Sequence, residues 1–305
     1  MNPINISTSP AILRWQPAAW LQISGADAGV FLQGQFTNEL RGLAAGAEVY
    51  GLWLTVKGKV LADSFVVRGA GAEEFWVGSY FSTAAVIRER LEAFVIADDV
   101  VIEDRTAEWS GLSIVGEGAA AWLGQAPAGG VAFAGRRARG ENVEWVAPRA
   151  VLAEAGAQLA ELSELDAGAA EARRIAEGIP AVPRDIGPAD LPNEGGLEAD
   201  AISYTKGCYL GQEVMARLKS MGQVRRRLVR VEIAAEAGAP PATPAALFAG
   251  PKQAGELRSV APNPAGGGWI GLAMVSLLTV GAVSGSGLSF ATDGAPVVRL
   301  KDPIA

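Results

Sequence analysis

Three strand-like runs follow one another between residues 48 and 80, joined by short turns. They are EVYGLWLTV (48–56), KVLADSFVVR (59–68) and EEFWVGSY (73–80). The first two meet at Lys57-Gly58, and a glycine turn joins the second to the third. β-branched and aromatic residues favour strands. Two strands joined by such a short turn pair as antiparallel neighbours. This stretch therefore predicts an antiparallel sheet, and any fold of the chain must be built around it.

Helical patterns flank this sheet. Residues 25–43 place apolar side chains at loosely helical spacing after Asp27, which can cap the start of a helix. Ser82 or Thr83 can cap a second helix, and a strand at 99–104 closes the unit. Helices packed on an antiparallel sheet define the α+β class, which is the fold class we predict.

A second succession of strands and helices begins near Trp109. It comprises a strand at 111–116, a helix at 118–124, a strand at 143–148 and two alanine-rich helices over about 151–177. We therefore predict that residues 1–221 form one body, with two related halves at about 1–105 and 106–221.

The pattern changes after a stretch rich in Pro and Gly. Residues 178–197 have no apolar periodicity and predict a loop, whose length indicates a functional segment or a linker. Short apolar runs broken by Gly and Pro follow, so we expect a small all-β barrel or sandwich over residues 222–305, with the boundary near Met221-Gly222.

Residues 259–292 carry no charge, but Gly and Ser interrupt the apolar run before it reaches about 18 residues, so we expect buried strands there and no membrane span.

The titratable side chains exclude several classes of site. The chain has no histidine and one cysteine among 305 residues. This composition rules out Ser-His and Cys-His nucleophile pairs, an internal disulfide, the usual zinc sets and a four-thiolate iron-sulfur centre. Acid-base chemistry would have to use carboxylates, lysines, tyrosines or the single thiol.

The single thiol lies in YTKGCYLGQEVMAR, residues 204–217. Apolar residues at 210, 214 and 218 are four apart and predict a helix from about Tyr209 to Ser220. Cys208 would then lie at the helix N-terminus, where unpaired N–H groups and the charge of Lys206 favour a thiolate. We expect a reactive or metal-contacting thiol, and the alternative is a small buried apolar side chain.

Residues 206–230 concentrate positive charge in an acidic chain. They contain seven Lys and Arg residues against one acid, Glu213, whereas the whole chain has a net charge of −7. Such a cluster indicates an anionic partner, either a carboxylate-bearing cofactor or RNA phosphate. The alternative is a basic strand edge that prevents aggregation. Between Tyr209 and Phe248 no aromatic residue offers a stacking platform, so direct binding of nucleic acid is not expected.

The motif resembles a known family signature. KGCYLGQE (206–213), with LPNE before it and RRRL after it, resembles the signature of the YgfZ-type folate-binding proteins. These are relatives of the glycine-cleavage aminomethyltransferase (T-protein, GcvT), and their mitochondrial counterparts assist iron-sulfur cluster assembly. The segments FLQGQFTNEL, KGKVLADSFVV and RIAEGIP resemble further family segments in the same order, so the resemblance covers nearly the whole chain.

The resemblance implies a tetrahydrofolate-binding accessory protein that supports assembly or repair of iron-sulfur enzymes, including tRNA-modifying ones. It implies a GcvT-like folate-binding body of antiparallel sheets with helices, closed by a small C-terminal β-barrel. Cys208 and Lys206 would be the functional residues at the cavity mouth, with Cys208 as a transient iron or cluster ligand. The implied partners are folate and iron-sulfur client proteins or the assembly machinery. The residues expected to contact folate are Gln35, Asn38, Lys57, Glu177, Tyr209, Gln212, Glu213 and Arg217.

Two departures from the family pattern bear on activity. The aminomethyltransferases have a pair of aspartates where this chain has Ala62-Asp63, and the missing carboxylate would stabilise a cationic transition state, so aminomethyl transfer is not expected. The family's pterin-contacting acid falls on Ala176, with Glu177 one residue later. Since a helix turns by about 100° per residue, Glu177 would leave the cavity face. The alternative function is a folate-dependent one-carbon transferase acting on an amine or on tRNA, with Asp63 as its carboxylate.

The compartment expected from the sequence is the cytoplasm. The first residues lack the basic segment and long apolar core of a secretory signal, and a single cysteine suits a reducing environment.

Overall fold

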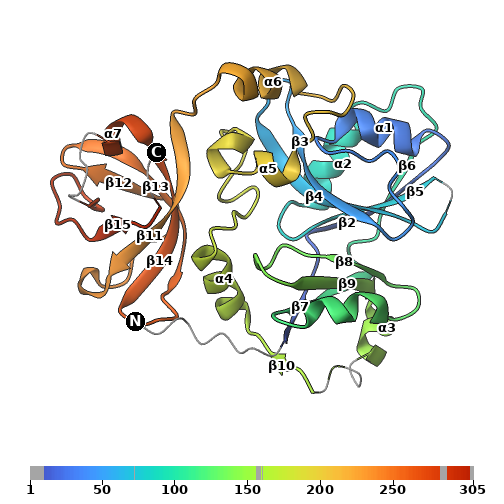
Figure 1. Cartoon of the computed structure of the whole chain (residues 1–305), viewed down its shortest axis with the longest axis horizontal. Coiled ribbons are helices and arrows are strands. Elements are labelled where there is room, and N and C mark those ends of the chain that lie inside the picture. Colours follow the sequence, from blue (N-terminus) through green and yellow to red (C-terminus); the bar gives the residue numbers. More distant parts are fainter. Residues whose placement is uncertain (1–9, 72, 156–158, 160, 282–286, 303–305) are drawn as a thin grey trace.

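Three sheets organise the chain. The computed structural model describes residues 10–71, 73–155, 159, 161–281 and 287–302. Within these ranges the strands form three five-stranded sheets. Figure 1 shows two of them in one body and the third, made of C-terminal residues, to the left. The predicted α+β class is confirmed.

The first sheet has the strand order β3-β4-β5-β2-β6 and contains the predicted antiparallel run. Its strands are β2 (Ala19–Ser24), β3 (Glu48–Leu54), β4 (Val60–Arg68), β5 (Glu74–Ser79) and β6 (Val101–Asp104). The turn between β3 and β4 holds Lys57-Gly58, as predicted, and Gly58 there has a φ of 69°.

Two helices, α1 (Ala28–Gln35) and α2 (Ala84–Glu92), contribute apolar side chains to the core on one face of this sheet. The hydroxyl of Thr83 caps α2, so that prediction is confirmed. Helix α1 is shorter than the predicted 25–43, and Asp27 does not cap it; its carboxylate accepts a hydrogen bond from the backbone of Asp99.

The second sheet has the order β10-β1-β7-β9-β8. Its strands are β1 (Ala11–Trp15), β7 (Trp109–Val115), β8 (Val131–Ala134), β9 (Asn142–Pro148) and β10 (Ser163–Glu164). Strand β1 pairs with β7, so the first described strand of the chain lies in the second sheet, beside strands from after residue 106. Buried rings of Trp20, Trp76, Trp109 and Phe133 pack together between the two sheets.

The helices of this region differ in part from the prediction. The predicted helix at 118–124 is a 3₁₀ helix, η1 (Ala119–Gln125). The alanine-rich stretch forms α3 (Arg149–Glu154) and α4 (Ala167–Ala176), with β10 between them. Residues 163–164 lie in the stretch predicted to be helical, but their backbone pairs with β1. The local alanine content could not indicate this pairing.

The third sheet is curled, with the order β12-β13-β14-β11-β15. Its strands are β11 (Arg226–Ala234), β12 (Ala245–Ala249), β13 (Lys252–Pro262), β14 (Gly268–Ser276) and β15 (Val298–Leu300). Isolated bridges of Phe248 with Ser289 and of Leu288 with Val298 link the two edge strands, as expected for a barrel. The domain boundary near Met221-Gly222 remains a prediction.

Part of the uncharged stretch is strand and part is helix. Strand β14 is buried along most of its length, and the short helix α7 (Leu277–Gly281) follows it, while residues 282–286 lie outside the described ranges. A 3₁₀ turn, η4 (Ala235–Ala237), follows β11. In the described part of the chain, no helix is both long and apolar enough to cross a membrane.

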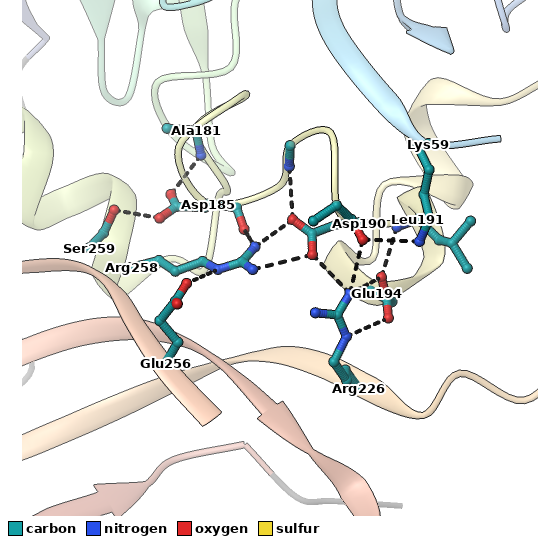
Figure 2. Close-up of polar contacts among 12 residues, drawn as sticks. Lys59, Ala181, Asp185, Asp190, Leu191, Glu194, Arg226, Glu256, Arg258 and Ser259 are labelled. Carbon is teal, nitrogen blue, oxygen red and sulfur yellow. Dashed lines mark hydrogen bonds and ion pairs between the residues drawn. The ribbon is translucent and has the colours of Figure 1, made fainter. Parts of the chain in front are cut away.

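The loop after α4 contacts the first and third sheets, and we call residues 178–196 the connecting loop. It contains only the short η3 (Pro192–Gly195), and α5 (Glu198–Ala201) follows it. Its backbone bonds to β4, where the amide of Val60 donates to the carbonyl of Asp190 at 3.1 Å. Figure 2 shows how Asp185 and Asp190 face the third sheet. Asp190 is 2% exposed and pairs with Arg258 at 2.6 Å and Arg226 at 3.0 Å.

Candidate functional site

Lys206 anchors the motif that holds the single thiol. Its ammonium donates to the backbone carbonyls of Gln33 (2.8 Å), Phe36 (2.6 Å) and Asn38 (2.8 Å), which lie at the end of α1 and just after it. The side chain is buried, and burial lowers the pKa of Lys206 to about 8. Three carbonyls match the three donors of an ammonium, so Lys206 fixes residues 203–211 to α1.

Two neighbouring residues complete this attachment. The backbone amide of Leu210 donates to the carbonyl of Gly34 at 3.3 Å. Gly211 has a φ of +86°, and a Cβ there would lie 2.8 Å from the carbonyl oxygen of Thr55 in the β3–β4 turn. The motif therefore packs closely on both α1 and the β3–β4 turn.

Cys208 lies on this anchored segment and is exposed. The helix predicted from about Tyr209 begins later, since α6 spans Gln212–Met221 with Gly211 in the left-handed N-cap position. Cys208 is thus four residues ahead of α6, and the prediction that it occupies the helix N-terminus is wrong. Gly207 does not have positive φ, so the sharp turn of this segment comes at Gly211.

Tyr209 is buried beside Lys206, with its ring 5.3 Å from the ammonium. It packs with Leu54 and Met215, and its hydroxyl has no hydrogen-bond partner among the described residues. Burial raises the pKa of Tyr209 to about 12, so the phenol keeps its proton at neutral pH and can donate. The side-chain oxygen of Gln35 is likewise buried without a partner.

The other predicted contacts divide between this corner and more distant places. Asn38 lies in the corner, where its amide donates to the carbonyls of Tyr50 and Asp200. Lys57 lies in the adjacent β3–β4 turn and is exposed. Glu177 lies at the end of α4, where its carboxylate accepts from Arg173 and from the backbone of Arg139.

The predicted residues on α6 face solvent. Glu213 and Arg217 form an ion pair at 2.9 Å and are 87% and 70% exposed. Gln212 is half-buried at the start of the helix. The structure therefore gathers Gln35, Asn38, Lys57, Lys206, Cys208 and Tyr209 around the end of α1 and the adjacent turn, and leaves Glu177, Glu213 and Arg217 apart from that corner.

Much of the basic cluster at 206–230 serves the fold itself. Lys206 is bound by carbonyls, Arg226 pairs with Asp190 and Glu194, and Arg230 pairs with Asp302. Lys219 lies over the ring of Tyr204 at 4.0 Å. Most of the basic side chains of residues 206–230 are thus paired within the fold.

Two carboxylates are buried in the body, Asp63, which the sequence singled out, and Glu144, which sequence reasoning missed. Asp63 accepts hydrogen bonds from Tyr50 at 3.0 Å and from Ser79 and Ser82 at 2.7 Å each. Burial raises the pKa of Asp63, and the guanidinium of Arg136 lies 4.0 Å from the Tyr50 ring. Every polar contact of the Asp63 carboxylate is thus made inside the fold.

Glu144 repeats this arrangement in the second sheet. Its carboxylate accepts from Tyr80 and Ser113 at 2.6 Å each, from Trp15 at 3.0 Å and from Asn142 at 3.1 Å. Burial raises its pKa as well. Apart from Asn142 in the same strand, the partners come from β1, β7 and the residue after β5, so no local pattern could have identified them. No group of three or more potential metal-ligating acids or thiols occurs in the described ranges.

Comparisons with known proteins cover most of the chain. The family model described as GCVT N-terminal domain matches residues 8–129. Human "Iron-sulfur cluster assembly factor IBA57, mitochondrial" is 31% identical over 286 residues, covering 87% of this chain and 77% of that protein. "tRNA-modifying protein YgfZ" of Edwardsiella ictaluri is 29% identical over 237 residues, covering 73% and 70%.

A solved structure shares the fold. The glycine cleavage system aminomethyltransferase T from Bartonella henselae superposes with a TM-score of 0.74, covering 89% of this chain and 79% of that one. Its sequence identity is 17%, so the likeness shows a common fold.

Proposed function

The chain belongs to the family of the iron-sulfur cluster assembly factor IBA57 and the tRNA-modifying protein YgfZ, and on this premise we propose that it is an accessory protein for assembly or repair of iron-sulfur enzymes. The observation that carries the proposal is the placement of Cys208. The only thiol of the chain is exposed on a segment that Lys206 and Gly211 hold against the body. A thiol held in this way can reach iron in a partner without a large rearrangement of its own segment.

Cys208 would act as one thiolate ligand to an iron or cluster that is cargo. The described part of the chain offers no companion acids or thiols in a group of three, so the remaining ligands would come from the client or the assembly machinery. Transfer then requires only exchange of one thiolate ligand for another. An exposed free thiol suits a reducing compartment, and we propose the cytoplasm.

The test is complementation in cells that lack this protein. Cells that carry Cys208→Ser should show loss of activity of a four-iron enzyme, including one that modifies tRNA, while cells that carry wild type recover it. Gly207→Ala is a matched control in the same segment, because a Cβ there meets no atom within 4 Å and φ is not positive. Full activity of the iron-sulfur enzyme in cells that carry Cys208→Ser would show that the function does not need the thiol.

We also propose tetrahydrofolate as a ligand, on the strength of the family resemblance. The expected contact residues fit such a ligand only at the corner of Gln35 and Tyr209, where two buried polar atoms have no partner within the described chain. A ligand acceptor could pair with the hydroxyl of Tyr209, and a ligand donor could pair with the side-chain oxygen of Gln35. Glu177 and Arg217 already have ionic partners elsewhere and are not part of this fit. When bound, tetrahydrofolate would supply a carrier for one-carbon units.

Calorimetry under anaerobic, reducing conditions tests this ligand. We expect wild type to bind tetrahydrofolate, and Tyr209→Phe, which removes only the hydroxyl, to weaken binding by about five- to tenfold. Tyr204→Phe is the matched control. Absence of binding to wild type would reject folate and leave the role of Cys208 standing. The transferase alternative has less support, because Tyr50, Ser79 and Ser82 occupy the carboxylate of Asp63.

A further inference from the structure

A cavity of about 280 Å³ lies away from the thiol, between β1, the residues after β5 and α4. One part of its wall is apolar and consists of Leu13, Trp15, Phe81, Ala167 and Ala170. Ligand pockets in proteins are usually about 300 Å³ or larger, so this cavity suits a single or fused ring.

Arg137 adds a guanidinium group to this wall. Its guanidinium lies 3.8 Å from the centre of the Tyr80 ring and 4.9 Å from that of Trp15, and its Nε donates to Ser113 at 3.3 Å. No described carboxylate forms a direct ion pair with it, and its charge acts on the buried Glu144, whose pKa it lowers against the effect of burial. Stacking on aromatic faces fixes the planar guanidinium and leaves its remaining donors for an anion.

The other charged groups of the wall are already paired. Arg174 bonds to Asp185 at 2.7 Å and to Glu171 at 2.6 Å. Glu171 also accepts from Arg184, so its charge is balanced by two guanidinium groups. Arg14 pairs with Glu164 at 3.3 Å. Arg137 is therefore the one charged residue of the described cavity wall that makes no direct ion pair.

We propose that this cavity binds a small aromatic carboxylate, with the ring against Trp15 and Phe81 and the carboxylate on the guanidinium of Arg137. A guanidinium presents two parallel donors that match a carboxylate, and aromatic walls favour a flat ring. The site uses none of the residues assigned to the thiol or to the Gln35–Tyr209 corner, so it stands independently of the proposed function.

Benzoate and benzamide are the probes, because they share a ring and differ in charge. Ligand-observed NMR and calorimetry on the full chain should detect saturable binding of benzoate, with benzamide at least tenfold weaker. Arg137→Met keeps an apolar stem over the rings and should weaken benzoate at least tenfold. Arg88→Met, on the surface of α2, removes one charge elsewhere and should leave the affinity unchanged.

A second variant keeps the test decisive if Arg137→Met fails to fold. Ala170→Leu fills the cavity from α4 without touching the guanidinium and should abolish benzoate binding while circular dichroism stays native. Equal affinity of benzoate and benzamide for wild type, no benzoate binding to wild type, or unchanged affinity in Ala170→Leu would each overturn the proposal. Tetrahydrofolate binding without benzoate binding would reject this site alone, and the reverse result would reject only the folate assignment.

Discussion

At the scale of single residues, the side chain with the largest effect on the motif is Lys206. Its position directly before Gly207-Cys208 suggests a catalytic partner for the thiol. Its three carbonyl contacts instead give it the role of an anchor, since all three donors of the ammonium are occupied. The thiol is presented to solvent because the lysine is buried.

Lys206→Met should therefore destabilise the fold. It would leave three buried carbonyls without a donor, and we expect the free energy of unfolding to fall by about 3 kcal/mol. Urea denaturation at neutral pH measures the change. Lys219→Met, at an exposed lysine over Tyr204, should cost less than about 1 kcal/mol. Equal losses in the two variants would contradict the anchoring role.

The two buried carboxylates should respond differently to amide substitution. Asp63 is bonded by three hydroxyls, which can reverse their hydrogen bonds, so Asp63→Asn should stay within about 1 kcal/mol of wild type at neutral pH. Glu144 accepts from the indole of Trp15 and the amide of Asn142, which only donate. Glu144→Gln would point an NH₂ group at one of them and should cost about 1–3 kcal/mol in a urea titration.

The pH dependence of stability gives a separate check on Asp63. Because burial raises its pKa above the ordinary 3.8, the folded state holds this proton to higher pH than the unfolded state. Ionisation of Asp63 therefore costs stability as pH rises above 3.8. The stability of Asp63→Asn relative to wild type should rise between about pH 4 and pH 7. A difference that stays flat over this range would show that Asp63 ionises normally.

At the scale of elements, Gly211 decides where α6 begins. Apolar residues at 210, 214 and 218 have helical spacing, but Gly211 takes a left-handed conformation and interrupts the pattern after its first member. This geometry lets the chain approach the β3–β4 turn and leaves Cys208 in an irregular, exposed segment.

Gly211→Ala tests this geometry directly. The new Cβ would be 2.8 Å from the carbonyl oxygen of Thr55, and the left-handed φ itself costs about 1–2 kcal/mol for a non-glycine residue. We expect a total loss of at least about 2 kcal/mol in thermal or urea unfolding. Gly207→Ala, four residues earlier, meets open space and should be close to neutral. A similar effect of both alanines would argue against the close contact with the turn.

At the scale of the whole molecule, the connecting loop holds the third sheet to the body. Asp190 and Asp185 are almost completely buried. Asp190 pairs with Arg226 and Arg258, as Figure 2 shows, and Asp185 pairs with Arg174 of α4. Arg226 and Arg258 come from β11 and β13, so they carry the contact into the C-terminal sheet.

Asp190→Ala should loosen this attachment. Removal of the carboxylate leaves two guanidinium groups facing a buried position, and breaking such a pair costs about 3–5 kcal/mol. We expect lower stability and earlier proteolytic release of the C-terminal sheet. Glu232→Gln breaks a surface pair with Lys301 and should cost less than about 1 kcal/mol. If both variants resist protease equally, the loop does not determine the position of the sheet.

The sequence by itself determined the α+β class, the antiparallel run at 48–80, the all-β C-terminal region and the resemblance of the motif at 206–213. These follow from local signals, since alternation of apolar residues, turn glycines and a contiguous motif can each be read within a few residues. Tertiary structure alone decided that Lys206 is an anchor, that Cys208 is exposed ahead of α6, and that β1 joins the second sheet. It also decided which residues surround Asp63 and Glu144. Each of these depends on contacts between segments far apart in the chain, such as Lys206 with Phe36. The energy of a buried charge depends on its partners in space, and these partners cannot be identified from residue spacing along the chain.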